Sequence, residues 1–123
     1  MLSEADIRAA LRDCYDPALP CNIVDLGMVR TILVVPDPDA PGSGIPGVPQ
    51  KVRITVAVTA TTPTDDADAH LSAQIRNRLA GLEAVSHTDV LFEEQPAWSP
   101  NDISPTGRRT LGLDGNRNLV QIR

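Results

Sequence analysis

The chain has 123 residues, of which 41% are hydrophobic and 22% are charged, and its formal net charge is −5. This length and composition predict one globular domain and exclude wholesale disorder, while the acidic balance argues against a surface that binds nucleic-acid phosphates. Two cysteines, Cys14 and Cys21, are too few for a disulfide scaffold or a closed four-cysteine metal site.

The first predicted element is a helix. Ser3 and Asp6 can form a capping box, and apolar residues share one helical face at Ile7, Ala10, Leu11 and Cys14. The Asp16-Pro17 pair should end this helix, because the residue before a proline is displaced from the helical region. A compact segment follows up to Gly27, the expected positive-φ residue, and residues 28–35 predict a strand rich in Val, Ile and Leu.

Residues 36–50 contain five prolines and three glycines. We interpret this segment as a long hairpin connection, because neither side of it is long enough to build a domain of its own. We expect a protease to cut it before either flanking strand. Residues 52–60 then alternate apolar and polar side chains, which predicts a strand with one apolar face.

Thr and Asp side chains between residues 61 and 68 predict a turn into a second helix. Its apolar face repeats every four residues up to the stop at Gly81, at Ala67, Leu71, Ile75 and Leu79. Residues 85–94 predict a third strand with Val90 and Phe92 inward. A short helix should then begin after the Ser104-Pro105 pair and end at Gly112.

The order α-β-β-α-β-α predicts a small two-layer α+β domain with its helices packed on one sheet. We expect this domain to span residues 1–113, and residues 114–123 to form a tail. Within the tail, Leu119, Val120 and Ile122 predict either a marginal strand or an irregular end. The N-terminal residues lack the basic and apolar regions of a signal peptide, and no apolar run reaches the roughly 20 residues of a membrane span. We therefore expect a cytoplasmic protein without membrane contact.

The turn before the second predicted helix is one candidate site. A helix N-terminus presents free N–H groups to an anion, and Asp66 and His70 share one helical face as a pair of metal ligands. The alternative is structural, with Thr64 and Asp65 as caps and Asp66 and Asp68 as complements of the helix dipole.

Two further places could carry function. Cys14 is most simply a buried apolar residue, whereas Cys21, in a loop bounded by prolines, has the better chance of exposure and reactivity. Trp98 is either a lid over a core short of aromatics or, beside Arg108 and Arg109, part of a partner surface. The chain has no nucleophile elbow, phosphate loop or dinucleotide fingerprint, so direct support for an enzyme is poor.

Three sequence blocks resemble those of a known family. Residues 16–29 read DPALPCNIVDLGMV and resemble its DPE-(I/L)-P-x-NIVDLG-(L/I)-(V/I) signature. Residues 59–63 are similar to its M-T-L-T-x-P strand end, and the PAW of residues 96–98 with residues 103–113 is similar to its closing block. This is the MIP18-like iron–sulfur assembly family, which includes the SufT and PaaD proteins. The resemblance covers residues 4–113.

The resemblance implies an α+β domain that assists, without catalysis, in maturing iron–sulfur or other metal-containing proteins. Many members carry a cysteine at the helix N-terminus, where the dipole lowers the thiol pKa and favours contact with a metal or cluster. This chain has Asp65 there, a poor substitute for a thiolate toward an iron–sulfur cluster. Either Cys21 supplies the thiol, or another metal binds through Asp65, Asp66, His70 or Asp25, or the scaffold is kept without the metal chemistry. The C-terminal cysteine cluster of PaaD-like members is also absent.

We therefore expect an accessory protein for iron–sulfur or metallocentre maturation that binds protein clients or an assembly scaffold. The alternative is a non-catalytic structural or regulatory subunit of a larger oxygenase- or hydrolase-type complex, and a metal-dependent enzyme is a minor third. Which cofactor is bound, a transient cluster or a metal ion, stays unknown, and a homodimer is a further alternative. The expected site residues are, for the family-motif pocket, Asp16, Asn22, Asp25, Thr61, Thr62 and Asp65; for a metal, Cys21, Asp65, Asp66 and His70; and for a partner surface, Trp98, Ser104 and Arg108.

Overall fold

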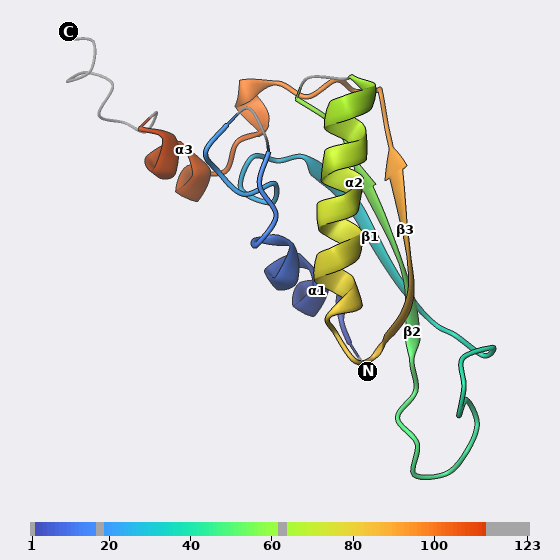
Figure 1. Cartoon of the computed structure of the whole chain (residues 1–123). Coiled ribbons are helices and arrows are strands. Elements are labelled where there is room, and N and C mark those ends of the chain that lie inside the picture. Colours follow the sequence, from blue (N-terminus) through green and yellow to red (C-terminus); the bar gives the residue numbers. More distant parts are fainter. Residues whose placement is uncertain (1, 17–18, 62–63, 113–123) are drawn as a thin grey trace, which may run out of the picture.

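The computed structural model describes residues 2–16, 19–61 and 64–112. Within these residues one three-stranded sheet is combined with three α-helices and a short 3-10 helix (Figure 1). The α+β class and the order α-β-β-α-β-α are as predicted. The elements are α1 (Glu4–Leu11), β1 (Val29–Pro36), β2 (Val52–Val58), α2 (Asp65–Ala80), β3 (Val85–Phe92), η1 (Pro100–Asp102) and α3 (Pro105–Leu111).

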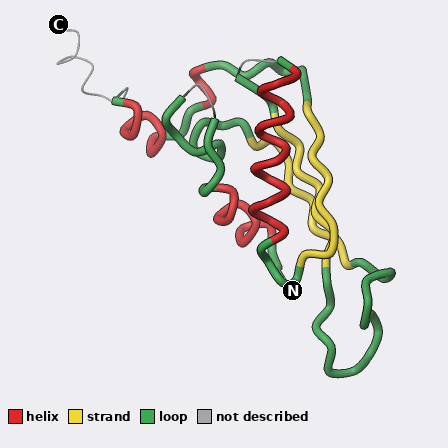
Figure 2. Tube along the Cα trace, in the orientation of Figure 1, coloured by secondary structure: helices red, strands yellow, loops and turns green. Residues whose placement is uncertain are grey.

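The strand order in the sheet is β1-β2-β3, with β1 antiparallel and β3 parallel to β2. The parallel pair is joined through α2, the helical crossover that such a pair needs. The carboxyl ends of β2 and β3 therefore meet at one edge of the sheet, next to the start of α2. Helices α1 and α2 lie together on one face of the sheet (Figure 2).

The core lies between this sheet face and the two helices. From α2 it receives Leu71, Ile75 and Leu79, which are almost completely buried, as their spacing of four residues predicts. Burying each of these side chains contributes about 1.5–3 kcal/mol. Val90 and Phe92 are partly buried against the same core, which confirms their inward orientation. From β2 the core receives Val52, Ile54, Val56 and Val58.

The first helix begins as predicted and ends earlier than predicted. The Ser3 Oγ accepts a hydrogen bond from the Asp6 N–H at 3.2 Å, and the Ser3 N–H donates to the Asp6 carboxylate at 2.9 Å. The helix ends at Leu11, so Cys14 lies beyond it. The Cys14 carbonyl instead accepts from the N–H of Ile23 at 2.9 Å. The last carbonyls of the helix accept from N–H groups three residues further on, so tight turns close the helix before the predicted stop at the Asp16-Pro17 pair.

Residues 37–51 connect β1 to β2 as the predicted hairpin loop. Its base is fastened by Asp37, a buried residue whose carboxylate accepts a hydrogen bond from the Ser86 hydroxyl at 2.6 Å. The other carboxylate oxygen accepts from the N–H of Asp39 at 3.0 Å. Asp37 therefore joins the loop to β3 across the sheet.

This contact predicts an acid-sensitive contribution to stability. The hydrogen bond from Ser86 lowers the pKa of Asp37 below its ordinary value. Ionised Asp37 therefore stabilises the fold at pH values above its unfolded pKa of about 3.9, and this stabilisation is lost as the pH falls through the lower folded pKa. We expect Asp37→Asn to flatten the acid side of the stability profile, measured by urea unfolding at a series of pH values. Ser86→Ala should flatten it as well, and an acid limb unchanged in both variants would contradict this role.

None of the helices in the described part of the chain is long and apolar enough to cross a membrane. The third helix, α3, begins after its N-cap Ser104 and ends at Gly112, as predicted. The expected domain boundary after residue 113 and the tail residues Leu119, Val120 and Ile122 lie outside the described residues.

Candidate functional site

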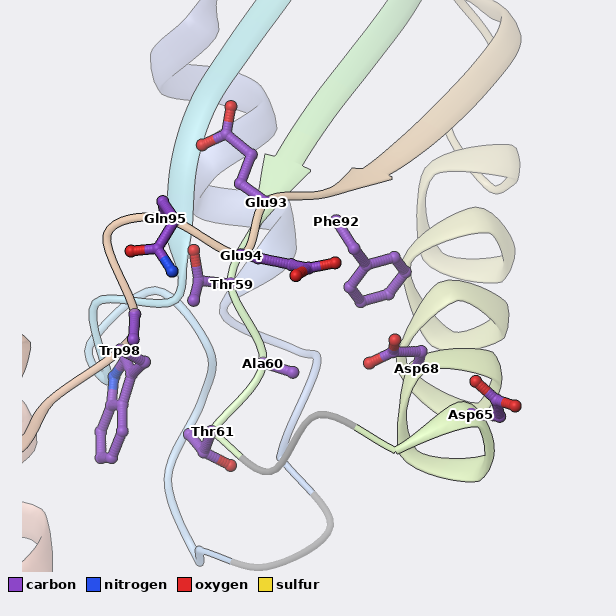
Figure 3. Close-up of a pocket in the computed structure, with 11 residues that line it drawn as sticks. Thr59, Ala60, Thr61, Asp65, Asp68, Phe92, Glu93, Glu94, Gln95 and Trp98 are labelled. Atoms are coloured by element: carbon purple, nitrogen blue, oxygen red, sulfur yellow. The ribbon is translucent and has the colours of Figure 1, made fainter.

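A pocket of about 420 Å³ opens at the carboxyl ends of β2 and β3 (Figure 3). The carboxyl ends of parallel strands are a common place for ligand sites, because the segments that follow them diverge. Three segments form the walls: the end of β2, the first turn of α2, and the residues that follow β3. The lining residues are Thr59, Ala60, Thr61, Asp65, Asp68, Phe92, Glu93, Glu94, Gln95, Ala97 and Trp98.

Several of the predicted site residues meet at this pocket. Thr61, Asp65 and Trp98 line it, although they come from three separate segments of the chain. The Thr61 hydroxyl also donates a hydrogen bond to the carboxylate of the buried Asp16 at 2.9 Å. This bond joins the strand end to the beginning of the signature loop, residues 16–27. Thr62 lies outside the described residues.

Asn22 and Asp25 organise the signature loop and do not line the pocket. The Asn22 side-chain amide donates to the Asp25 carboxylate at 2.8 Å, and its carbonyl oxygen accepts from the Asp25 N–H at 2.9 Å. Asp25 also holds the start of α3, because its carbonyl accepts from the Ser104 N–H at 2.7 Å and its carboxylate from the Ser104 hydroxyl at 3.2 Å. The pair thus ties the loop to the closing block.

Trp98 is held by a hydrogen bond and by contacts with the core, and its role at a partner surface stays a prediction. Its indole N–H donates to the Leu26 carbonyl at 2.6 Å, and the side chain packs against the core while it also lines the pocket. Arg108, predicted for a partner surface, donates to the carbonyl of Pro100 at 3.0 Å. Ser104 caps α3 by accepting from the Gly107 N–H at 3.0 Å. All three side chains of the closing block therefore make structural contacts, two of them with the signature loop.

Arg30 is a site residue that sequence reasoning missed. Its guanidinium donates to the Thr59 hydroxyl at 2.9 Å and to the carbonyl of Pro96 at 3.2 Å, and it lies 3.4 Å from the carboxylate of Asp102. It thereby fastens β1 to two walls of the pocket. Asp102 is 72 residues further along the chain, and no motif or periodicity pairs the two.

Asp68, Phe92, Glu93 and Glu94 are further lining residues that the sequence analysis did not assign to the site. Asp68 is the most unusual, because its Oδ1 atom is buried and has no hydrogen-bond partner within the described residues. Burial raises the pKa of Asp68, and the nearby Asp65 carboxylate raises it further. The sequence signal that could have predicted an acidic pocket is the grouping of acidic residues within 65–68 and at 93–94.

Neither cysteine lies at the pocket. Cys14 and Cys21 are both free thiols and are each only 1% exposed, so the expectation that Cys21 is accessible was wrong. Burial raises the pKa of both thiols, and the Asp25 carboxylate raises that of Cys21 further. The reason is the fold of the signature loop, which turns Cys21 into the core instead of toward solvent.

We expect both thiols to react slowly in the folded protein. Alkylation by iodoacetamide near neutral pH should be roughly a hundredfold slower than in denaturant, because a buried thiol with a raised pKa reacts only when its surroundings open. Mass spectrometry of each cysteine peptide over time measures the two rates. Rapid labelling of Cys21 in the folded state would contradict its burial.

The predicted metal ligands do not gather. Asp65, Asp66 and His70 are exposed on the first turns of α2, away from the buried Cys21. Among residues 2–16, 19–61 and 64–112, no group of three or more His, Cys, Asp or Glu side chains is arranged to hold a metal ion. The donors at the pocket are carboxylates, hydroxyls and an amide, whereas iron–sulfur clusters are held by thiolates.

Comparison with known proteins finds similarity to proteins of iron–sulfur assembly and maturation. A family model described as "Iron-sulfur cluster assembly protein" matches residues 4–40, which contain the signature loop. A "Fe-S protein maturation auxiliary factor" of Porphyromonas gingivalis is 26% identical over 111 residues, 90% of this chain and 92% of that protein.

Two solved structures share the fold. One is a domain of unknown function, DUF59, from Bacillus anthracis, with a TM-score of 0.69 and 22% identity over 89% of this chain and 92% of that one. The other is a conserved hypothetical protein from Thermotoga maritima, with a TM-score of 0.62 and 22% identity over 90% of this chain and 95% of that one. The sequence blocks, the matched family model and these relatives agree in their similarity to iron–sulfur cluster assembly proteins, and the solved structures share the fold.

Proposed function

We propose that this protein is an accessory factor in the maturation of iron–sulfur proteins, and that it acts by contact with other proteins rather than by catalysis. The matched family model and the name of the Porphyromonas gingivalis relative support a role in this process. The same proposal includes a cytoplasmic location, which the two free thiols support because oxidising compartments favour disulfides.

One structural observation carries the proposal: the three sequence blocks of the family come together at one end of the molecule. Asp16 of the first block accepts from Thr61 of the second, and Leu26 of the first accepts from Trp98 of the third. A further pair of hydrogen bonds joins Asp25 to Ser104. Blocks that are distant in the chain are thus joined next to the pocket, which the second and third blocks line, and a shared binding function would explain why all three occur together.

The chemistry of the pocket supports a role through protein contacts. Its lining combines carboxylates with aromatic side chains, and both thiols of the chain are buried elsewhere. Such a lining suits side chains of a partner better than an iron–sulfur cluster, which is soft and needs thiolates. We therefore treat the cluster as cargo of the partner proteins. We assign the contact to the pocket, which Thr61 and Asp65 line.

Depletion of the protein in its native organism tests this function. We expect the activity of an iron–sulfur dehydratase in extracts to fall, while a dehydrogenase without a cluster keeps its activity. Re-expression of Asp39→Lys should restore the dehydratase and Asp65→Lys should not, because both variants make the same charge change but only Asp65 lines the pocket. An unaffected dehydratase, or an equal loss of both enzymes, would contradict the proposed function.

A further inference from the structure

We propose that the pocket binds a basic side chain, an arginine of a protein partner, between its aromatic walls and its carboxylates. The inference rests on the proposed function, because it names the chemistry of the protein that the pocket contacts. It starts from the pocket itself, a cavity of about 420 Å³ that is open at the surface and formed by three separate segments.

Charge is the first argument. Asp65, Asp68, Glu93 and Glu94 line the pocket, and no lysine or arginine is among the lining residues that the structure describes. In Figure 3 the carboxylates of Asp68 and Glu94 lie on the Phe92 side of the pocket, whereas Glu93 points away. Cations are attracted into a concave site with one sign of charge, because its low-dielectric walls concentrate the field.

Two positive groups lie near the pocket, the Arg30 side chain and the N-terminus of α2, and both already have partners. The guanidinium of Arg30 is bound by the Thr59 hydroxyl, the Pro96 carbonyl and the Asp102 carboxylate. The N-terminus of α2 is capped by Thr64, whose hydroxyl accepts from the Ala67 N–H at 3.1 Å, and its first turn carries three aspartates. The three aspartates offset the positive end of α2, and the guanidinium of Arg30 is engaged by its own partners.

The aromatic walls select the kind of cation. Trp98 and Phe92 lie on opposite sides of the pocket, with the Glu94 carboxylate directed into the space near Phe92 (Figure 3). The Trp98 indole is held in place by its bond to the Leu26 carbonyl at 2.6 Å, so this wall is preorganised. A planar guanidinium stacks on aromatic faces while its edge donates to carboxylates, which a compact ammonium or a metal ion cannot do.

Asp68 supplies the remaining observation. Its Oδ1 atom is buried and lacks a hydrogen-bond donor, although buried carboxylate oxygens are nearly always paired. A guanidinium carries five N–H donors, which is enough for the carboxylates of Asp68 and Glu94 together. Arginine in the pocket would place N–H donors next to a carboxylate whose Oδ1 atom has no donor within the described residues.

A titration with a short peptide tests the inference, because Trp98 is the only tryptophan of the chain and reports on the pocket. The probe is the blocked tripeptide acetyl-Ala-Arg-Ala-amide, and its control carries the neutral isostere citrulline in place of arginine. We expect a saturable change in Trp98 fluorescence, with about tenfold weaker binding of the citrulline peptide. Shifts of amide NMR signals give a second readout, and they should concentrate in residues 59–61, 65–68 and 92–98.

Two double variants with the same change in net charge distinguish binding in the pocket from general electrostatic attraction of the peptide to an acidic protein. Asp68→Asn/Glu94→Gln should weaken arginine binding about tenfold, whereas Asp39→Asn/Glu83→Gln, at exposed positions outside the pocket, should change it by less than about twofold. Equal binding of both peptides, or an equal loss in both variants, would overturn the inference. So would saturable binding of Mg²⁺ or Zn²⁺ at these residues without any response to the arginine peptide, which would assign a metal site.

The peptide titration needs neither a cluster nor a client protein. Arginine binding with an unaffected dehydratase after depletion would therefore refute the proposed function and leave the pocket chemistry standing. A dehydratase that fails after depletion, together with no response to the peptide, would refute the arginine site and leave the maturation role.

Discussion

Gly27→Ala is expected to destabilise the protein by more than about 3 kcal/mol and to lower its Tm by roughly 15 °C. Gly27 has a φ of +76°, and a Cβ placed there would lie 2.1 Å from the carbonyl oxygen of Asp102. The signature loop and η1 can therefore pack closely only because residue 27 has no side chain. Thermal and urea unfolding measure the loss.

A matched control separates the close approach from the backbone conformation. Gly44 has a φ of +82° and no heavy atom within 4 Å of an added Cβ, so Gly44→Ala should cost only about 1 kcal/mol. Gly27→Asn tolerates the positive φ better than alanine but retains the contact with Asp102, and it should stay nearly as unstable as Gly27→Ala. Equal effects at the two glycines would show that the approach to Asp102 is unimportant.

Asp25→Ala is expected to cost about 2 kcal/mol, because it removes an acceptor shared by Asn22 and Ser104 within a buried network. It also removes the weaker attraction to Arg12, whose guanidinium lies 4.0 Å from the carboxylate. The exposed Asp39 provides the comparison, since Asp39→Ala should change the free energy of unfolding by less than about 0.5 kcal/mol.

A double-mutant cycle locates this loss. Combined with Ser104→Ala, Asp25→Ala should show a coupling of about 1 kcal/mol, because the two side chains share a hydrogen bond. Additive effects of the two substitutions would mean that the loop and α3 are held together by their backbone contacts alone.

The helices and strands could be predicted from the sequence because the patterns that indicate them are local. The alternation of Val52, Ile54, Val56 and Val58 and the four-residue spacing of Leu71, Ile75 and Leu79 are periodicities of single elements, and the structure buries all of these residues. The caps at Ser3, Thr64 and Ser104 are contacts over three residues and were equally readable. The end of α1 was not, because tight turns replace the helix from Arg12 and the Cys14 carbonyl that follows pairs with the distant Ile23.

The candidate site could be predicted from the sequence only in part. Resemblance to a family pointed to Thr61, Asp65 and Trp98, and all three line the pocket. It could not say that Asn22 and Asp25 would instead pair with each other and hold α3. Nor could it show that Asp68 and Glu94 line the same pocket, or that Arg30 binds the Pro96 carbonyl beside it. These residues come from segments that are far apart in the chain.

The two cysteines show the same difference between what the sequence and what the tertiary structure can decide. Composition alone excluded a disulfide scaffold and a closed four-cysteine site, because counting ligands needs no coordinates. Whether Cys21 could act as a thiolate depended on its exposure, and the folded loop buries it in the core. The sequence by itself determined the α+β elements, through local periodicity, and the resemblance to a family, through motifs. The tertiary structure decided the accessibility and partners of each side chain, because burial and long-range hydrogen bonds exist only once distant segments have packed together.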